Sequence, residues 1–85
     1  MVPVKVDKTN VRTGVILRVL RKHRGHSLKD IEELTNGNVK ASILSAYERG
    51  ERAITVPRLL YILDLYNYKA SSFFYRLEKA EEELQ

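Results

Sequence analysis

The chain has 85 residues, enough for one domain with a single hydrophobic core. It contains no cysteine, which excludes disulfides and thiolate metal sites. No apolar run approaches the roughly 18 residues of a membrane span, and no signal-peptide pattern is present, so a cytoplasmic location is the default expectation. The net charge of +4 is uneven, with twelve Lys/Arg against six Asp/Glu over residues 1–60 and three against five over residues 61–85. A basic front with an acidic tail is typical of a protein that presents one face to phosphate, although +4 is also ordinary for a soluble domain.

Residues 1–9 alternate apolar and polar side chains. The pattern fits a short edge strand, because Pro3 excludes a central one, or an extended arm that follows a nucleic-acid backbone. A disordered terminus is the commoner outcome for such a segment. We interpret residues 1–9 as an arm and residues 10–85 as one domain. The start at Met1 favours a complete short protein, and the polar C-terminal end fits a complete protein or a domain.

Helical spacing predicts a first helix from about Asn10 to Arg24. Asn10 or Thr13 can cap it, Gly14 is a mild flaw in its middle, and Gly25 ends it. Its apolar stripe consists of Val11, Ile16, Leu17 and Leu20.

Residues 27–50 predict a short helix, a turn and a second short helix. The opening serine is a good N-cap, and Asp30 three residues later can complete a capping box. The sequence Thr-Asn-Gly-Asn at 35–38 breaks the helix, because Gly is a poor helix former and Asn favours turns. Helical spacing resumes for a helix at about 40–49 and stops at Gly50.

Two short helices joined by a tight turn are the helix-turn-helix signature, in which the second helix can enter a DNA major groove. Any small helical bundle also needs helix, turn and helix, so spacing alone leaves the two interpretations about even. Small side chains allow close approach to base edges, and hydroxyls and cations can donate hydrogen bonds to them. The outward positions of the second helix have this small or polar character: Lys40, Ser42, Ser45, Ala46 and Arg49. Its composition therefore favours DNA.

The sequence offers no enzyme motif. It has no glycine-rich phosphate loop, no nucleophile motif and no zinc spacing. His23 and His26 are three residues apart, but no carboxylate or thiolate completes a metal site with them. We therefore expect no enzymatic activity, no cofactor and no metal.

Two more helices are predicted after a loop that carries Arg52. Thr55 caps the fourth helix, which tolerates Pro57 in its first turn and ends at Asn67. This helix is apolar nearly all round, so we expect it at the centre of the core.

The fifth helix is predicted to open at Ser71 or Ser72 and to run toward Leu84, with Phe73, Phe74 and Leu77 packing inward. Its last stretch, RLEKAEEELQ, is either a solvated tail or a coiled-coil-like dimer strip. About one and a half heptads would make a weak strip on their own.

From Val15 to Phe74 the chain resembles the Cro/C1-type helix-turn-helix domain of the XRE family of bacterial and phage regulators. The resemblance lies in LRVLRKHRGHSLKDI at 17–31 and in SAYERGERAITVPRLLYILDLYN at 45–67. These stretches contain a leucine–arginine helix, a glycine with a small hydroxyl cap, a helix ending in Glu-Arg-Gly, and a capped leucine-rich helix. The resemblance implies an all-α, compact five-helix lambda-repressor-like helix-turn-helix domain with an extended C-terminal helix.

The resemblance also implies roles for individual residues. Ala41, Ser42 and Ser45 match the family's base-reading positions, and Ile43 is placed to touch a thymine methyl group. The full set expected at base edges is Lys40, Ala41, Ser42, Ile43, Ser45, Ala46 and Arg49. The residues expected at DNA phosphates are Ser27, Arg52 and Arg58, and those at positions that form an ion pair in the family are Arg21 and Glu48.

Three features depart from the common family pattern. Leu28 replaces a glutamine that contacts phosphate, Ile31–Glu32 replaces a leucine–alanine pair, and the turn is about two residues longer. These features, with Lys40–Ala41 and the Tyr-Glu-Arg-Gly ending, are similar to the DNA-binding domain of an actinobacterial developmental regulator that has a second, ligand-binding domain. We carry over the DNA-binding mode and not the ligand.

The expected function is a sequence-specific, duplex DNA-binding transcriptional regulator, a repressor associated with the nucleoid. Because one short recognition helix reads few bases, we expect a homodimer through the region of Phe73, Phe74, Leu77 and Leu84, with the valine-rich N-terminus as second choice. The alternative is a protein-interaction module with the same fold, such as an antitoxin or an adaptor, whose working surface is the apolar tail.

Overall fold

The computed structural model describes the backbone of residues 8–83 and the side chains of residues 8–80. Within this range the chain forms helices and no strands, so the expected all-α, five-helix fold is confirmed. The helices are α1 (Thr9–His23), α2 (Leu28–Leu34), α3 (Ala41–Glu48), α4 (Val56–Leu65) and α5 (Ala70–Glu83). Of the expected arm, residues 1–7 lie outside the described part of the chain, and so does Leu84.

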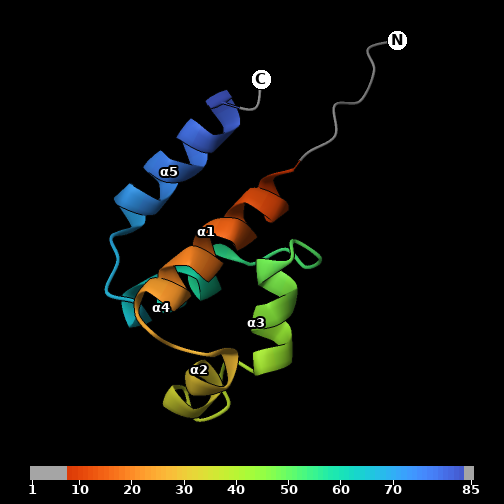
Figure 1. Cartoon of the computed structure of the whole chain (residues 1–85), viewed down its shortest axis with the longest axis vertical. Helices are drawn as coiled ribbons and strands as arrows, with labels where there is room; N and C mark the ends of the chain where they lie inside the picture. The colour runs from red at the N-terminus through yellow and green to blue at the C-terminus, as the bar shows by residue number, and fades with distance from the viewer. Residues whose placement is uncertain (1–7, 84–85) are drawn as a thin grey trace.

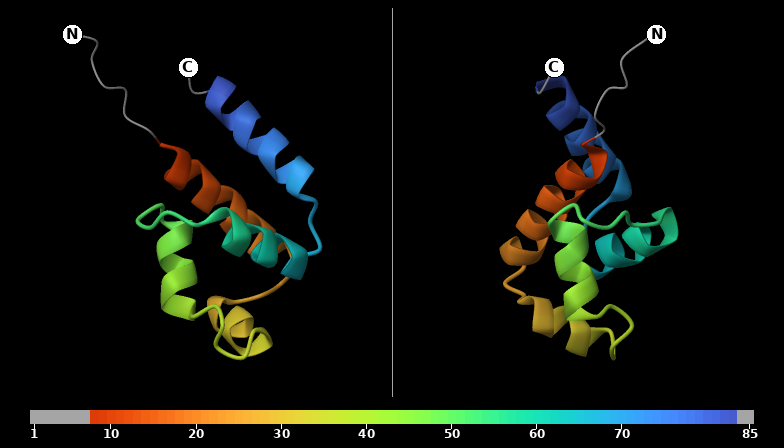
Figure 2. Two further views of the ribbon diagram at one scale, coloured as in Figure 1. Left: turned by 180° about the vertical axis from the view of Figure 1, so that it is seen from behind. Right: turned by 90° about the vertical axis from the view of Figure 1, so that its right-hand side faces the viewer.

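Helix α1 is the element around which the others are arranged. It packs against both α3 and α5, and α3 packs in turn against α2 (Figure 1). Helix α5 runs alongside α1 in every view, and α2 lies at the opposite end of the molecule from the end of α5 (Figure 2). The pair α2–α3 therefore projects from a body made by α1, α4 and α5.

The core draws side chains from all five helices and from the α2–α3 turn. The largest fully buried side chains are Tyr66, Phe73, Leu17, Ile31, Leu44, Ile62, Leu63 and Val39. Helix α4 supplies several of them, as its composition predicts, but its outer face carries the exposed side chains of Leu60 and Tyr61. Val11, predicted for the apolar stripe of α1, is also exposed, because the core face of α1 is centred on Leu17.

Each of the first four helices ends in a Schellman motif. The residue after the C-cap adopts a left-handed conformation, and the N–H of the residue that follows it donates back into the last turn. The left-handed residues are Gly25, Asn36, Gly50 and Asn67. The predicted stops at Gly25, Gly50 and Asn67 are therefore confirmed by their backbone angles.

The predicted N-terminal caps are correct for two helices and wrong for others. The side chains of Ser27 and Thr55 accept hydrogen bonds from the first turns of α2 and α4, as predicted. Helix α1 has Lys8 at its N-cap and no side-chain cap, so the prediction of Asn10 or Thr13 is wrong. Helix α5 begins before the predicted serines, because the Phe73 N–H already donates to the Lys69 carbonyl at 3.1 Å.

Gly14, predicted to be a mild flaw in α1, lies where α1 crosses the end of α3. A Cβ atom there would lie 2.4 Å from the carbonyl oxygens of both Tyr47 and Glu48. At the same crossing, a Cβ on Gly50 would lie 2.7 Å from the Cα of Val11. The two glycines let the backbones of α1 and the end of α3 approach closely, which any side chain would prevent.

We predict that Gly14→Ala lowers the free energy of unfolding by about 1–3 kcal/mol, because the added methyl group overpacks the crossing. This loss should exceed the gain of about 1 kcal/mol from the better helix propensity of alanine. Urea denaturation measures the change. Val15→Ala, at an exposed position next in the chain, is the control and should change stability little. A Gly14→Ala variant more stable than the wild type would show that the helices can separate freely.

Candidate nucleic-acid interface

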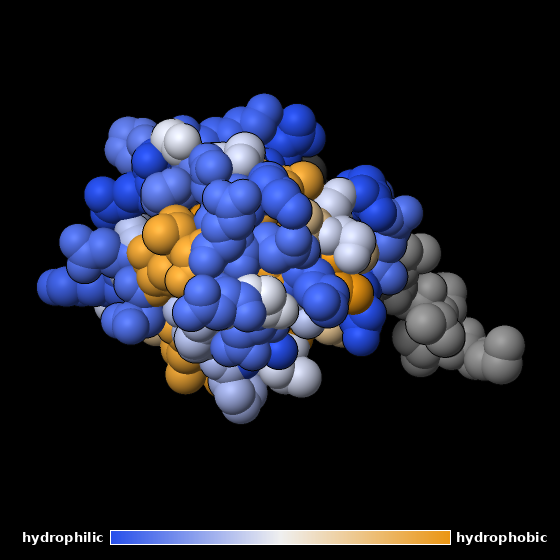
Figure 3. Space-filling model, turned by 90° about the horizontal axis from the view of Figure 1, so that it is seen from below, coloured by the Kyte–Doolittle hydropathy of each residue, from blue (hydrophilic) through white to orange (hydrophobic). Residues whose placement is uncertain are grey.

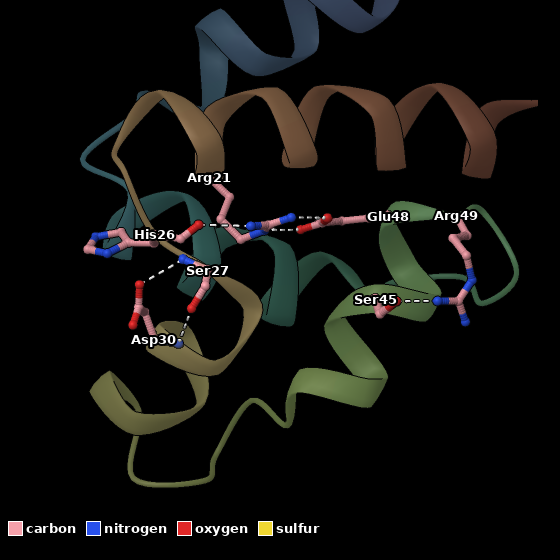
Figure 4. Close-up of polar contacts among 7 residues, drawn as sticks. All are labelled: Arg21, His26, Ser27, Asp30, Ser45, Glu48 and Arg49. Carbon is pink, nitrogen blue, oxygen red and sulfur yellow. Dashed lines mark hydrogen bonds and ion pairs between the residues drawn. The ribbon is translucent and has the colours of Figure 1, made fainter.

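Helix α2, the turn after it and α3 form one corner of the molecule, with the start of α3 beside α2 (Figure 1). Figure 3 views this end of the molecule, where hydrophilic residues cover most of the surface and apolar residues form separate patches. The geometry of the corner depends on a small set of polar contacts, several of which Figure 4 shows.

The N-terminus of α2 is closed by a full capping box. The Asp30 N–H donates to Ser27 Oγ at 3.0 Å, and the Ser27 N–H donates to the Asp30 carboxylate at 2.7 Å (Figure 4). The Ser27 N–H holds the pKa of the Asp30 carboxyl below its usual range, so the group stays ionised at neutral pH. The Asp30 carboxylate therefore occupies this end of α2, beside Ser27.

The turn between α2 and α3 is organised by Thr35, whose side chain is buried. Its hydroxyl donates to the Ile31 carbonyl at 2.8 Å and accepts from the Val39 N–H at 3.0 Å. Asn36 and Gly37 follow one another in left-handed conformations, which reverses the chain over a few residues. The longer turn is therefore tightly hydrogen-bonded.

Helix α3 has no cap of its own. Its N-cap residue, Lys40, makes no side-chain cap bond. Instead Glu32 of α2 accepts a hydrogen bond from the Ala41 N–H at 2.9 Å, and its second oxygen lies 3.2 Å from the Lys29 ammonium. The Ala41 N–H, and then Lys29, hold the pKa of the Glu32 carboxyl below its usual range. A carboxylate of α2 thus caps the N-terminus of α3.

The two faces of α3 differ in burial. Leu44, Tyr47 and Glu48 are buried against the body. Of the predicted base-reading residues, Lys40, Ser42 and Arg49 are exposed, and Ala41, Ser45 and Ala46 are partly exposed. Ile43 is half-buried and packs against the core, so only part of its side chain is available to a partner.

Arg49, the C-cap residue of α3, contacts Ser45 one turn earlier in the helix. The Arg49 guanidinium donates to Ser45 Oγ (Figure 4) and also pairs with the carboxylate of Glu51. Both contacts are exposed and would have to rearrange if either side chain bound another molecule.

Arg21 and Glu48 form a buried, bidentate ion pair between α1 and the end of α3. The Arg21 Nε lies 2.7 Å from one carboxylate oxygen and a terminal nitrogen lies 2.8 Å from the other. The remaining terminal nitrogen donates to the His26 carbonyl at 2.8 Å (Figure 4). The exposed fractions of the two side chains are only 8% and 5%. Donation to Glu48 raises the pKa of Arg21, so the guanidinium remains charged.

Tyr66 is buried in the core, and its hydroxyl has no hydrogen-bond partner among the described residues. Burial, and then the negative charge of Glu48, raise the pKa of this phenol. Tyr66 is therefore neutral near the ion pair.

The two arginines predicted at phosphates sit on either side of the start of α4. Arg52 is exposed in the loop after α3. Arg58 is half-buried in the first turn of α4 and donates from a terminal nitrogen to the Asn38 carbonyl at 2.9 Å. This bond joins α4 to the α2–α3 turn.

The structural roles of three residues, Glu32, Thr35 and Arg24, were not predicted from the sequence. Glu32 was noted only as a departure from the family pattern, and Thr35 only as part of a turn. Arg24 donates to the carbonyls of Tyr66 and Asn67 at 2.7 and 3.1 Å, which ties the end of α1 to the end of α4. The Arg24 contacts join segments far apart in the sequence, whereas Thr35 bonds residues four positions away on either side and Glu32 bonds a residue nine positions later. The local Thr35 contacts could have been predicted from the sequence.

The predicted dimer surface on α5 needs one correction. Phe73 is fully buried and belongs to the core, so it is not available to a second molecule. Phe74, predicted to pack inward, has 44% of its surface exposed and touches Phe73 edge to face. Tyr75 beside it is also exposed, and Leu77 packs against the core. The apolar surface of the described part of α5 is therefore Phe74 and Tyr75.

Neither a metal cluster nor a membrane-spanning helix occurs in the part of the chain that the structure describes. No three His, Asp or Glu side chains gather there as metal ligands. None of its helices is long and apolar enough to cross a membrane.

Comparison with known proteins gives a family and a structural match. The sequence model of the helix-turn-helix family matches residues 17–73. The crystal structure of the DNA-binding domain of BldD is 35% identical, covers 81% of this chain and 97% of its own, and has a TM-score of 0.75. The structure of the S. venezulae BldD DNA-binding domain is 36% identical in sequence, and the match covers 79% of this chain and 97% of that domain with a TM-score of 0.74. No curated protein matches the sequence.

We predict that Arg21→Ala lowers the free energy of unfolding by about 3–5 kcal/mol, because it leaves the Glu48 carboxylate buried without a partner. Arg21→Ala combined with Glu48→Gln should recover part of this loss, since the uncompensated charge is gone. The measurement is urea denaturation at neutral pH, with Arg18→Ala, an exposed arginine of the same helix, as control. If Arg21→Ala and Arg18→Ala unfold at the same urea concentration, the pair does not stabilise the fold.

Proposed function

Because the chain belongs to the Cro/C1-type (XRE) helix-turn-helix family, we propose that it is a transcriptional regulator that reads duplex DNA with α3. The family and the fold are those of DNA-binding regulators. The observation that carries the proposal is that α3 has a buried apolar face and an outward face of small and polar side chains. A helix of this kind can lie in the major groove with its backbone near the bases.

In the proposed complex, the N-terminal part of α3 approaches the base edges. Ser42 and Ser45 are placed to exchange hydrogen bonds with bases, and Ala41 permits close approach. Lys40 and Arg49 flank this surface and can donate to guanine or to phosphate. Since α3 carries no Asn or Gln for a bidentate adenine contact, DNA shape contributes to specificity.

The backbone contacts in this complex come from the loop and from α4. The proposed phosphate-binding residues are Arg52, in the loop after α3, and Arg58, which is bonded to the turn before α3. Ser27 contributes little here, because the Asp30 carboxylate occupies the end of α2.

We further propose that two copies bind a palindrome, since a pair of recognition helices about 34 Å apart reads two successive major grooves. The proposed dimer contact is the pair of exposed aromatic side chains on α5, Phe74 and Tyr75. Such a dimer would repress by occupying promoter DNA, in the cytoplasm and on the nucleoid.

A second candidate function is a protein-interaction module, such as an antitoxin or an adaptor. The observation in its favour is the exposed apolar surface away from α3. Besides the aromatic pair on α5, it includes a valine stripe on the outer side of α1, formed by Val11, Val15 and Val19. In this case α5 or α1 would be the working surface and the polar face of α3 would be incidental.

Selection from random duplex DNA, followed by salt titration on the recovered sequence, distinguishes the two functions. We expect a palindromic motif whose affinity falls steeply as salt rises, because several phosphates are neutralised by Lys and Arg. A motif without two-fold symmetry would contradict the dimer and leave the DNA-binding function. Recovery of no motif, together with co-purification of a stable protein partner, would favour the protein-interaction module.

We predict that Ser42→Glu abolishes binding to the selected motif while the domain stays folded. A bulky acid at this exposed position of α3 would meet both base edges and phosphates. The expected loss is at least about 1–3 kcal/mol of binding free energy, the discrimination of a base contact, with added charge repulsion. His23→Glu at the end of α1 is the control, because it adds the same charge at an exposed position outside both α3 and the proposed dimer contact on α5. Equal gel-shift affinity for both variants would show that α3 does not read the DNA.

A further inference from the structure

Helix α3 depends on another helix for its N-terminal cap. A helix N-terminus leaves N–H groups unsatisfied, and its dipole attracts negative charge. The residue at the N-cap of α3 is Lys40, which makes no side-chain cap bond, and the first turn of α3 carries no acidic residue. The negative group at this end is the Glu32 carboxylate of α2, which accepts the Ala41 N–H at 2.9 Å.

The Glu32 carboxylate also lies beside the surface of α3 that is proposed to face DNA. Ala41 is the first residue of α3 and one of the proposed base-reading residues. Recognition helices contact bases mainly through their N-terminal residues, so the Glu32 carboxylate lies beside the surface that would face DNA. A carboxylate there repels phosphate, whereas the helix N-terminus by itself would attract it.

We infer that Glu32 is a positioning residue of the recognition helix and that its charge weakens binding to DNA of arbitrary sequence. The inference rests on the proposed function. Its positioning part follows from the bond between α2 and the first N–H of α3, which fixes the angle between the two helices together with the Thr35 bonds.

The charge of Glu32 is only partly compensated. Lys29 lies 3.2 Å from its second oxygen, but the Lys29 side chain is 69% exposed and that of Glu32 is 28% exposed. An ion pair so open to water is weak and screened, and Lys40, the other nearby cation, is exposed. A phosphate near the start of α3 would therefore meet a repulsive contribution from Glu32 that opposes the attraction of Lys29 and Lys40.

This repulsion acts unequally on specific and non-specific binding. Non-specific complexes gain essentially all their free energy from phosphate contacts, so a nearby carboxylate weakens them directly. A specific complex also gains base contacts, which require α3 to be held at one angle. By fixing that angle and opposing phosphate, Glu32 increases the ratio of specific to non-specific affinity.

Two substitutions separate the two roles. Glu32→Gln keeps an oxygen that can accept the Ala41 N–H but removes the charge, whereas Glu32→Ala removes both. The matched controls are Glu33→Gln and Glu33→Ala, since Glu33 is the next residue of α2, carries the same charge and is exposed. The probes are the selected palindrome and a random-sequence duplex, each measured over a salt series, and thermal unfolding is followed for every variant.

We expect Glu32→Gln to bind the random duplex about threefold more tightly than the wild type, as for removal of one surface charge near phosphate, and the gain should shrink at high salt. Its gain on the palindrome should be smaller, so its specificity ratio falls. Glu32→Ala should melt about 4–8 °C lower than the wild type, as for loss of a helix cap. Glu32→Ala should also bind the palindrome more weakly than the wild type. The Glu33 variants should change the melting temperature and the DNA affinities less than the Glu32 variants do.

The outcomes that would overturn the inference differ from those that would overturn the proposed function. Equal affinities of Glu32→Gln and wild type on both duplexes, or an equal effect of Glu33→Gln, would refute the charge role while DNA binding stands. Equal melting temperatures of Glu32→Ala and Glu33→Ala would refute the positioning role whether or not DNA binds. A wild-type protein that binds neither duplex would refute the proposed function and the charge role with it.

Discussion

The close crossing of α1 and the end of α3 is the constraint on which the rest of the structure depends. Gly14 and Gly50 bring the two backbones together, and the Arg21–Glu48 pair joins the same two helices a short distance along. The glycines remove the steric barrier, and the ion pair supplies a directional contact whose charges are satisfied only at one separation and orientation. Since α3 is the proposed DNA reader, the same crossing sets how that helix projects from the body.

The α2–α3 corner is anchored to the body by the buried side chains of Val39, Leu44 and Tyr47, whereas polar contacts set the arrangement of α2 within it. Only Ile31 of α2 is buried, so this short helix supplies little hydrophobic anchoring. The capping box, the buried Thr35 hydroxyl, Glu32 and Arg58 instead fix its ends and its angle to α3. Such contacts leave the outer surface polar, which suits a surface that must meet a charged, hydrated partner.

The sequence predicted best what is decided locally. The caps at Ser27 and Thr55 and the stops at Gly25, Gly50 and Asn67 each follow from the chemistry of a residue and its near neighbours. What it predicted poorly depends on packing between distant segments. Gly14 has a low helix propensity, and the sequence does not show that its lack of a side chain lets α3 approach α1. The cap of α3 was missed because it comes from a different helix, α2. Likewise, adjacent phenylalanines look equivalent until the packing of α5 buries one and exposes the other.

The bond between Arg58 and the Asn38 carbonyl has a consequence for the entropy of DNA binding. Arg58 is already held in one orientation by that bond, and its other guanidinium N–H groups remain for a phosphate. Arg52 has no such bond among the described residues, so its side chain would lose rotamer freedom only on binding. This ordering costs about 0.5–1.5 kcal/mol of binding free energy for a long side chain. Of the two proposed phosphate contacts, the preorganised Arg58 would therefore give the larger net contribution to affinity, although Arg52 is the more accessible.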